Sequence, residues 1–474
     1  MNIRSVSHQR DRTLHVEHEA HRLSFVLSNA PLAWAGVGVS GLALAGLVVW
    51  ERIPLMLAAG CSLAVAAVVV LATMGNRPKI LFLFFLNSCL LVVAQRDAGG
   101  IDFIVLLSLL TALLTGFGLA SIKHARDTTL GPVLGDSYFG AVQYTLVGFA
   151  VLSVISTISN SQSIISLLSW VNGLTFAFLT CRAQASQLPS FSTARRAILV
   201  GGALAVTYDL YLLSTGRALN VGTFNSGRFV GSLGDYELLA EFYGALILLC
   251  LTAIFFDDSR RWRVASYVLI VPSFVILFAT QSRGPIVILC AVAPILALIS
   301  AFQFRESAGK ILAIFGGLAV VVFISIGTLS ATPLFERLSS IQLEGSIEST
   351  LNRAGVWDYF TQLPRFVDSG LTGNGFDYPY EEIGTYPHSL YLWLLWSGGI
   401  LILVCFGLLI SLILCKLLRG IFVRQSASLS AAAIILYILL DEIKIEAART
   451  SPSVCFLWVV LSLTILASRE QREL

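Results

Sequence analysis

The sequence predicts an all-α, polytopic membrane protein with about fourteen transmembrane helices. Of its 474 residues, 56% are hydrophobic and only 12% are charged, and the mean hydropathy is +0.82. A soluble protein usually has about a quarter of its residues charged. Long apolar runs recur along the whole chain, and each can cross roughly 30 Å of hydrocarbon. A soluble core does not need such a succession of runs.

The predicted spans are separated by polar connections that are mostly short. They cover 32–50, 53–74, 80–95, 103–122, 138–158, 164–181, 197–214, 236–256, 264–280, 285–302, 311–332, 389–414, 429–443 and 453–467. We therefore expect a cytoplasmic tail, an N-terminal bundle of about seven helices, a C-terminal bundle and a second cytoplasmic tail. These parts cover residues 1–29, 30–214, 215–468 and 469–474.

The distribution of basic residues predicts the orientation. If the N-terminus is placed inside, 21 of the 31 Lys and Arg residues fall in inside segments and 10 fall outside. This twofold excess is the positive-inside pattern of an inner (cytoplasmic) membrane protein, with both termini cytoplasmic. The polar N-terminal tail and the long first apolar run predict a retained anchor rather than a cleaved signal peptide.

Two outside connections are long enough to have a function. The segment 215–235 contains several glycines, and the loop 333–388 is rich in aromatic residues and becomes Gly-rich toward its end. Loops of this length between helices are usually functional or disordered. Within the second loop, the stretch RAGVWDYFTQLPRF, which begins at Arg353, predicts a short amphipathic helix near the membrane surface.

Four outside residues are candidates for a periplasmic active site: Arg228, Arg283, Arg353 and His388. Taken singly, an arginine at a helix end usually extends its charge to lipid headgroups or caps backbone carbonyls, and an interfacial histidine is usually structural. Taken together, these residues occur where the charge bias makes them least expected. Arginine also suits bidentate binding of phosphate and carboxylate better than lysine does.

These residue types fit transfer from a diphosphate-activated lipid. Two or three arginines can bind a pyrophosphate and stabilise the charge that grows on it as a leaving group, without a metal. His388, at the start of the twelfth span, is the outside group that normally titrates near neutral pH. The helix dipole there favours neutral imidazole, which can act as a general base toward a sugar hydroxyl.

Three acidic residues are further candidates, each with an equally plausible structural role. Asp209 lies in the seventh span near Tyr208 and Tyr211, and intramembrane acids are functional candidates by default. Glu237 and Glu241, one helical turn apart, can orient Arg228 or an acceptor sugar, or serve as salt-bridge partners. The chain shows no nucleotide-binding glycine loop, zinc-type spacing or Asp-x-Asp motif, so we expect no metal, no cofactor and no nucleic-acid partner.

The order of several segments resembles the superfamily of O-antigen ligases and Wzy-type O-antigen or exopolysaccharide polymerases. The segments are GRFVGSLGDYELLAEF, QSRGP, NRAGVWDYF, GLTGNGFDYP and PHSLYLWLLWSGGILILVCFGLL, which together span roughly residues 215–415. The first six predicted spans match only in being hydrophobic. The resemblance departs from the family at Glu237 and Ser389, where the family often has Asn.

The resemblance implies a metal-independent, inverting glycosyltransferase of the membrane-embedded GT-C type. The donor would be a glycan on undecaprenyl diphosphate at the periplasmic face, and the acceptor a glycan or glycolipid. Arg228 and Arg283 would hold the diphosphate, His388 would be the base, and Arg353 would match a recurrent loop arginine. Other polysaccharide assembly proteins and membrane lipid would be its partners.

Three functional hypotheses stay open at this point. A polysaccharide polymerase is favoured slightly over a ligase that transfers the glycan to a lipid A-core or other acceptor. A flippase or transporter of lipid-linked oligosaccharide is the alternative from another class, although the chain has no evident internal repeat. A membrane scaffold without catalysis is the third, and its outside Arg and His residues should tolerate substitution.

Overall fold

A computed structural model of the chain describes residues 76–89, 137–159, 164–183, 188–216, 227–304, 309, 357–358, 370–376, 386–446 and 451–470. Its helices are α3 (Asn76–Cys89), α5 (Ser137–Ser159), α6 (Ile164–Arg182), α7 (Phe191–Ser214), the 3-10 turn η4 (Gly231–Leu233), α8 (Tyr236–Phe256), α9 (Arg260–Ala279), α10 (Arg283–Gln303), α16 (Leu390–Phe422), α17 (Ser426–Asp441) and α18 (Ser451–Arg469). In the described part of the chain the secondary structure is helical throughout, with no strand, as predicted.

The described helices support a membrane-embedded protein. Six of them are long and apolar enough to cross a membrane: α5, α7, α8, α9, α10 and α16. The helix α17 and the Ser453–Arg469 part of α18 are shorter and also apolar. The predicted spans 32–50, 53–74, 103–122 and 311–332 lie outside the described residues, so the total of fourteen stays a prediction.

Two predicted spans are extended the most in the structure, and a hydropathy pattern alone does not predict these extensions. The helix α7 begins at Phe191 rather than at residue 197, because Ser190 caps it by accepting a hydrogen bond from the Thr193 amide. Its first turns include Arg195, whose charge is paired within the protein. The helix α16 continues to Phe422 rather than to residue 414, and it is interrupted at Gly399.

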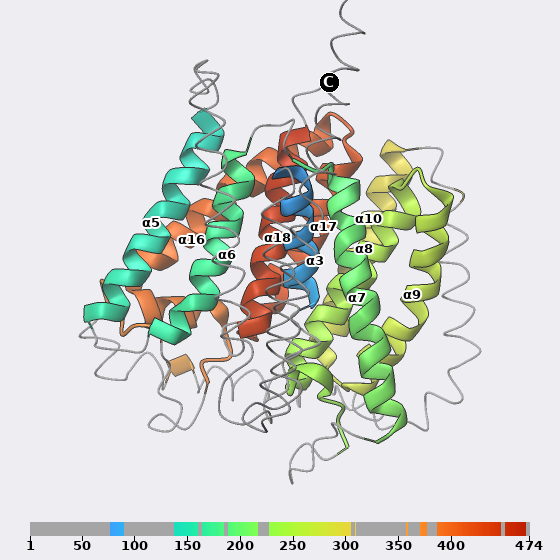
Figure 1. Cartoon of the computed structure of the whole chain (residues 1–474), viewed down its shortest axis with the longest axis horizontal. Coiled ribbons are helices and arrows are strands. Elements are labelled where there is room, and N and C mark those ends of the chain that lie inside the picture. The colour runs from blue at the N-terminus through green and yellow to red at the C-terminus, as the bar shows by residue number, and fades with distance from the viewer. Residues whose placement is uncertain are drawn as a thin grey trace, which may run out of the picture. The chain divides into compact units, whose positions relative to one another are not determined.

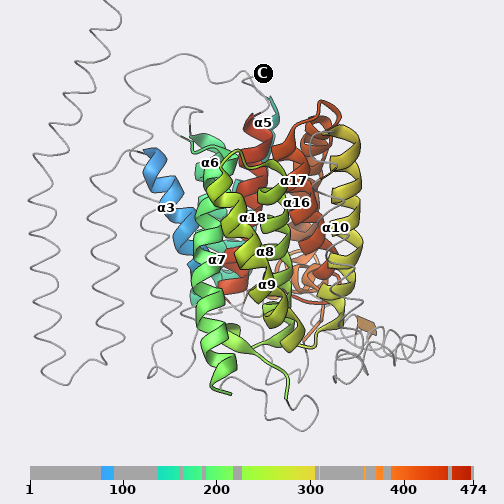
Figure 2. The ribbon, with the colours of Figure 1, turned by 90° about the vertical axis from the view of Figure 1, so that its right-hand side faces the viewer.

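Met1–Lys79 with Asp97–Ile101, and Ile80–Arg96 with Asp102–Leu474, form two compact units. Of the first unit, the described residues are the opening turn of α3. In the second unit, α8 is the central helix: all residues from Leu238 to Phe255 are buried, and α7, α9, α10, α17 and α18 pack around it (Figures 1 and 2). A helix that is apolar on all sides is expected to be buried on all sides.

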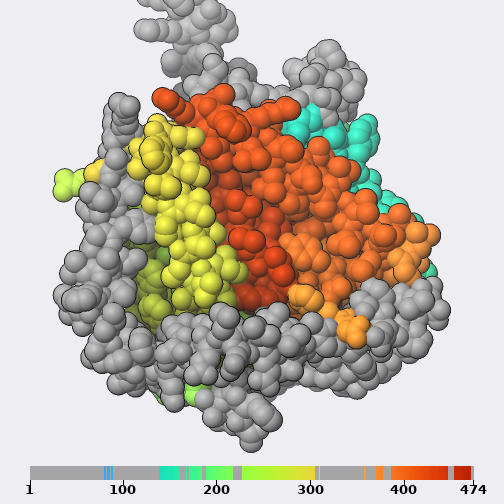
Figure 3. Space-filling view, turned by 180° about the vertical axis from the view of Figure 1, so that it is seen from behind, coloured from blue at the N-terminus to red at the C-terminus, as the bar shows by residue number. Residues whose placement is uncertain are grey.

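The helices α5, α6, α16 and α18 form the neighbouring part of the same unit (Figure 1). Trp170 of α6 stacks on Trp393 of α16, with ring centroids 5.2 Å apart, and Gly173 lies directly against Trp458 of α18. Helices from both predicted bundles therefore share this core, and the boundary at residue 214 stays a prediction. Figure 3 shows the opposite view, where α10 (yellow) lies beside the orange and red residues of α16 and α17.

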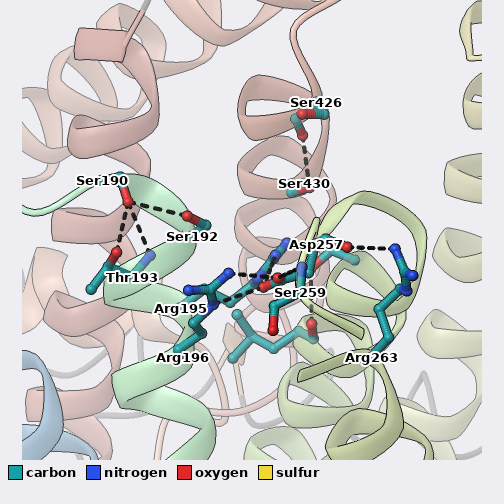
Figure 4. Close-up of polar contacts among 12 residues, drawn as sticks. Ser190, Ser192, Thr193, Arg195, Arg196, Asp257, Ser259, Arg263, Ser426 and Ser430 are labelled. Atoms are coloured by element: carbon teal, nitrogen blue, oxygen red, sulfur yellow. Dashed lines mark hydrogen bonds and ion pairs between the residues drawn. The ribbon is translucent and has the colours of Figure 1, made fainter. Parts of the chain in front are cut away.

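One end of the central helices is held by a buried ion cluster. Asp257, which follows α8, accepts hydrogen bonds from Arg195 at 3.0 Å and from Arg196 at 2.6 and 3.0 Å (Figure 4). Arg263 donates to the Asp257 carbonyl from α9. Although burial opposes ionisation of this carboxyl, the hydrogen bonds from Arg196, the Ser259 amide and Arg195 lower the pKa of Asp257 below its ordinary value. The cluster ties α7, α8 and α9 together at this end.

The interruption in α16 is filled by a distant segment of the chain. Residues 370–376 (GLTGNGF) lie against Trp396–Gly399, and the amides of Asn374 and Gly375 donate to the carbonyls of Trp396 and Ser397, both at 2.8 Å. The Ile400 amide donates in turn to the Gly370 carbonyl at 2.9 Å. Backbone groups within a membrane need partners inside the protein. The segment supplies those that the broken helix lacks.

This end of the predicted outside loop is therefore packed into the helical core rather than running entirely over its surface. Phe376 is 3% exposed and lies edge-on to both Trp170 and Trp393. Ser156 of α5 joins the contact, because its hydroxyl donates to the Ser397 carbonyl and accepts from the Gly375 amide. The predicted amphipathic helix lies outside the described residues except for Trp357 and Asp358.

We predict that Asp257→Asn lowers the stability of the protein by about 3 kcal/mol at neutral pH, because two guanidinium groups lose a buried carboxylate. The native pKa is depressed, so the stabilisation is present above the ordinary Asp pKa of about 4 and is lost as the pH falls through the native value. Thermal unfolding of the purified protein from pH 7 downward measures this. A difference between wild type and variant that does not shrink in acid contradicts the assignment. Asp258→Asn is the matched control.

We predict that Gly373→Ala lowers the free energy of unfolding by about 2 kcal/mol or more. Gly373 has a φ of 74°, and a Cβ atom there would overlap the backbone of Ser397 and Gly398. Gly407→Ala, in the unbroken part of α16 with no atom near its Cβ position, should be neutral or slightly stabilising. Equal melting temperatures for the two variants would show that the docked segment adds no stability.

Candidate functional site

Arg228 lies in the loop that leads into α8 and is held by its neighbours on both sides. Phe229 is completely buried, and its amide donates to the Ala279 carbonyl at the end of α9, at 3.1 Å. The guanidinium of Arg228 lies over the ring of Tyr236, with its Cζ atom 4.3 Å from the ring centroid. This cation–π contact and the buried phenylalanine direct the half-buried arginine toward the α9–α10 turn.

Asp209 anchors this loop to the helices. Its carboxyl accepts hydrogen bonds from the Ser232 amide at 2.7 Å, the Ser232 hydroxyl at 3.1 Å and the Tyr243 hydroxyl at 2.7 Å. Gly231, with a φ of 52°, leaves room for the carboxyl, since a Cβ atom there would lie 2.8 Å from its oxygen. The Asp209 carboxyl is thus hydrogen-bonded to Ser232 and Tyr243, which come from the loop and from α8. The contacts describe a structural role that positions Arg228.

Arg283 begins α10 directly after a tight turn. The turn has Gln281 at a φ of 52°, and the Ser282 amide donates to the Thr280 hydroxyl at 3.2 Å. The charges of Arg228 and Arg283 lie close enough to repel one another. Two arginines from separate loops therefore lie within electrostatic range of one another. We call this side of the structure, where Arg228 and Arg283 lie, the arginine end.

A short charged segment after α17 completes the arginine end. Lys444 forms a salt bridge with Asp441, with a 2.8 Å distance between Nζ and Oδ1. The lysine side chain also lies directly on Gly284, where a Cβ atom would overlap its ammonium. Asp441, Glu442 and Glu446 are all fully buried. The segment Asp441–Glu446 thus brings a third cation onto the residue that follows Arg283, together with three buried acids.

His388 is anchored on the same segment. The first amide of α16, that of Leu390, donates to the carbonyls of Glu442 at 3.0 Å and Ile445 at 3.1 Å. His388 itself has a φ of 49°, in the left-handed region that non-glycine residues seldom adopt. Such backbone strain persists only where the surroundings impose it and is common at functional sites. Backbone hydrogen bonds therefore join the start of α16, next to His388, to the segment Asp441–Glu446. Lys444 of that segment in turn lies on Gly284, which follows Arg283.

Glu241 turns toward this charged segment. Its carboxyl is 6% exposed, hydrogen-bonds the Glu442 side chain and interacts electrostatically with Asp441 and Lys444. Two carboxyl groups can share a hydrogen bond only when one of them carries a proton. A small cavity beside Glu241 is lined by Leu238, Glu241, Phe242, Ser453, Phe456 and Leu457. Glu237, half-buried in the first turn of α8, has its amide bound by the capping Asp235.

The structure brings most of the predicted site residues to one end. Arg228, Arg283, His388 and Glu241 are joined there by the contacts described above, whereas Arg353 lies outside the described residues. Lys444 and the segment Asp441–Glu446 are not among the site residues that the sequence predicts. The sequence feature that could have indicated them is the unusual density of charge in DEIKIE, between two apolar runs.

The described residues contain no group of three or more His, Cys, Asp and Glu side chains placed to hold a metal ion. The acids at the arginine end are instead engaged with one another and with Lys444. The arrangement offers cationic donors for an anion, a histidine and buried carboxyl groups. The sequence matches no known protein-family model, and no characterised protein matches it significantly.

We predict that Asp209→Ala lowers the free energy of unfolding by about 2–4 kcal/mol, because buried donors from Ser232 and Tyr243 lose their acceptor. The loss should also loosen the loop that carries Arg228. Amide hydrogen exchange of residues 227–235 should accelerate more than exchange in α10. Tyr211→Phe, at an exposed position on the same helix, is the control and should leave both measurements unchanged.

Proposed function

We propose that this protein is a membrane glycosyltransferase that polymerises oligosaccharide carried on undecaprenyl diphosphate. The observation that carries the proposal is that Arg228 and Arg283, from separate loops, lie within electrostatic range of one another at one end of apolar helices, with Lys444 on the adjacent Gly284. Guanidinium groups bind phosphate oxygens bidentately and stabilise a diphosphate leaving group. The resemblance of this region to polymerases and ligases gives the same assignment, and the charge distribution assigns the arginine end to the periplasmic face.

In the proposed reaction, a hydroxyl oxygen of the acceptor sugar attacks the anomeric carbon of the donor. The bond between that carbon and the diphosphate oxygen breaks, and undecaprenyl diphosphate leaves with the electron pair. His388 accepts the hydroxyl proton as general base, and the arginines stabilise the charge that develops on the leaving diphosphate. Attack on the face opposite the leaving group inverts the anomeric centre.

The acids have a supporting role in this scheme. The buried pair of Glu241 and Glu442 lies at the segment on which the start of α16 is anchored, so it can orient an acceptor hydroxyl toward His388. Asp209 acts through Ser232 by holding the Arg228 loop. Neither role requires a metal, because the cations for the diphosphate come from the protein.

A ligase that transfers the glycan to lipid A-core or another acceptor uses the same chemistry, so the two differ only in the acceptor. A flippase is the alternative from another class. Broken helices are common at the binding sites of transporters. Here, however, the residues 370–376 already occupy the break in α16, which favours a fixed structural element over a transport site.

We predict that Arg228→Ala, Arg283→Ala and His388→Gln each reduce glycan transfer by about a hundredfold or more. The measurement is the size-resolved surface glycan of a deletion strain that expresses each variant, together with its undecaprenyl-linked intermediates. Arg260→Ala, at the exposed first residue of α9, is the matched control and should complement fully.

The outcomes separate the hypotheses. Single repeat units that reach the surface unextended indicate a polymerase, and long chains stranded on the lipid carrier indicate a ligase. Repeat units trapped on the cytoplasmic side indicate a flippase. Full complementation by all three site variants, at wild-type protein levels, would remove the catalytic assignment and leave a scaffold.

A further inference from the structure

Lys444 occupies a position between the arginines and the acids. Its amide donates to the Asp441 carbonyl in the turn after α17, and its ammonium pairs with the Asp441 carboxyl at 2.8 Å. The lysine side chain is 20% exposed, while its carboxyl partner is fully buried. The cation therefore has a path toward solvent that its counter-ion does not have.

Gly284 makes this position available. A Cβ atom at residue 284 would overlap the Nζ and Cε atoms of Lys444, so only glycine allows the ammonium to lie on the first turn of α10. Gly284 directly follows Arg283, whose charge interacts with that of Arg228. The glycine of QSRGP thus lets a third cation lie on the first turn of α10, on the residue that follows Arg283.

Cations gathered at one end of the helices repel one another where water is scarce. Asp441 offsets part of this repulsion by pairing with Lys444. The side chains of the other nearby acids, Glu241 and Glu442, are hydrogen-bonded to one another. A bound diphosphate would bring enough negative charge to attract all three cations.

We propose that Lys444 is a third diphosphate-binding residue, and that Asp441 tunes the affinity by competing with the ligand for the lysine. The inference rests on the proposed function and extends its anion site beyond the arginines. Lysine suits this role because its ammonium is a compact charge with three donors on a flexible stem, whereas the planar arginine forks are fixed in direction. The side chain exchanges the Asp441 carboxylate for a phosphate oxygen when the donor binds.

The proposal makes opposite predictions for the two partners of one salt bridge. Lys444→Ala should weaken diphosphate binding by about tenfold, or about 1.4 kcal/mol, because a hydrogen bond between two charged groups is lost. Asp441→Asn should strengthen binding several-fold, because it releases the lysine. If Lys444 served only as the counter-ion of Asp441, both changes would perturb folding and neither would raise affinity.

The test uses the purified full-length protein in lipid nanodiscs and titrates farnesyl diphosphate by calorimetry. A second series uses inorganic pyrophosphate in place of farnesyl diphosphate. If the lysine contacts the diphosphate itself, Lys444→Ala lowers the affinity for both probes by about the same factor. Lys416→Ala, on α16 at the opposite end, is the matched lysine control. Melting temperatures and the double variant Lys444→Ala/Asp441→Asn separate a loss of fold from a loss of binding.

Weaker binding for Lys444→Ala with tighter binding for Asp441→Asn supports the proposal. Wild-type affinity in folded Lys444→Ala, or weaker binding in folded Asp441→Asn, overturns it while leaving the glycosyltransferase assignment intact. Absence of diphosphate binding by the wild-type protein, with farnesol as the uncharged reference, would overturn both.

Discussion

The complete burial of α8 is the constraint on which the described structure depends. In a helix with neighbours on every side each charged group needs a partner within the protein, and the acids of α8, Glu237 and Glu241, lie in its first two turns. Asp257 follows one end and is paired with two arginines; Asp235 caps the other and the Arg228 loop leads into it. Because the surrounding helices pack on α8, the loops at their ends lie close to the end of α8. The candidate site is formed by these loops.

A second constraint is that backbone groups at membrane depth need partners within the protein. The break at Gly399 would leave amides and carbonyls without partners, and the docked residues 370–376 bind them. The same loop is fixed by Phe376, which packs edge-on against two stacked tryptophans. The part of α16 that precedes the break begins just after His388. The packing of a distant loop therefore helps to set the position of that histidine. Contacts made by residues 370–376 thus help to determine the position of a residue at the site.

The predictable features are those encoded locally. Apolar run length predicts the helices α5 to α10, and arginines against the charge bias identify Arg228 and Arg283. The docking of residues 370–376 is a tertiary contact, and a Gly-rich stretch alone reads as an exposed loop. In the sequence, Lys444 is one of the ten basic residues placed outside, and it was not singled out. Its significance comes from its contact with Gly284, which depends on the tertiary structure. Asp209 was recognised, but its partners Ser232 and Tyr243 depend on how the loop folds back.

The proximity of acids to arginines at the arginine end has a physical reason. A cluster of cations alone would be unstable in a medium of low dielectric, so an empty anion site needs counter-charge from the protein. The same counter-charge also competes with the anionic ligand, unless the cation can leave its acidic partner when the ligand binds. A lysine whose partner is buried and whose own head is partly exposed meets this requirement. The helices need not move, because the exchange takes place along one flexible side chain lying on a glycine.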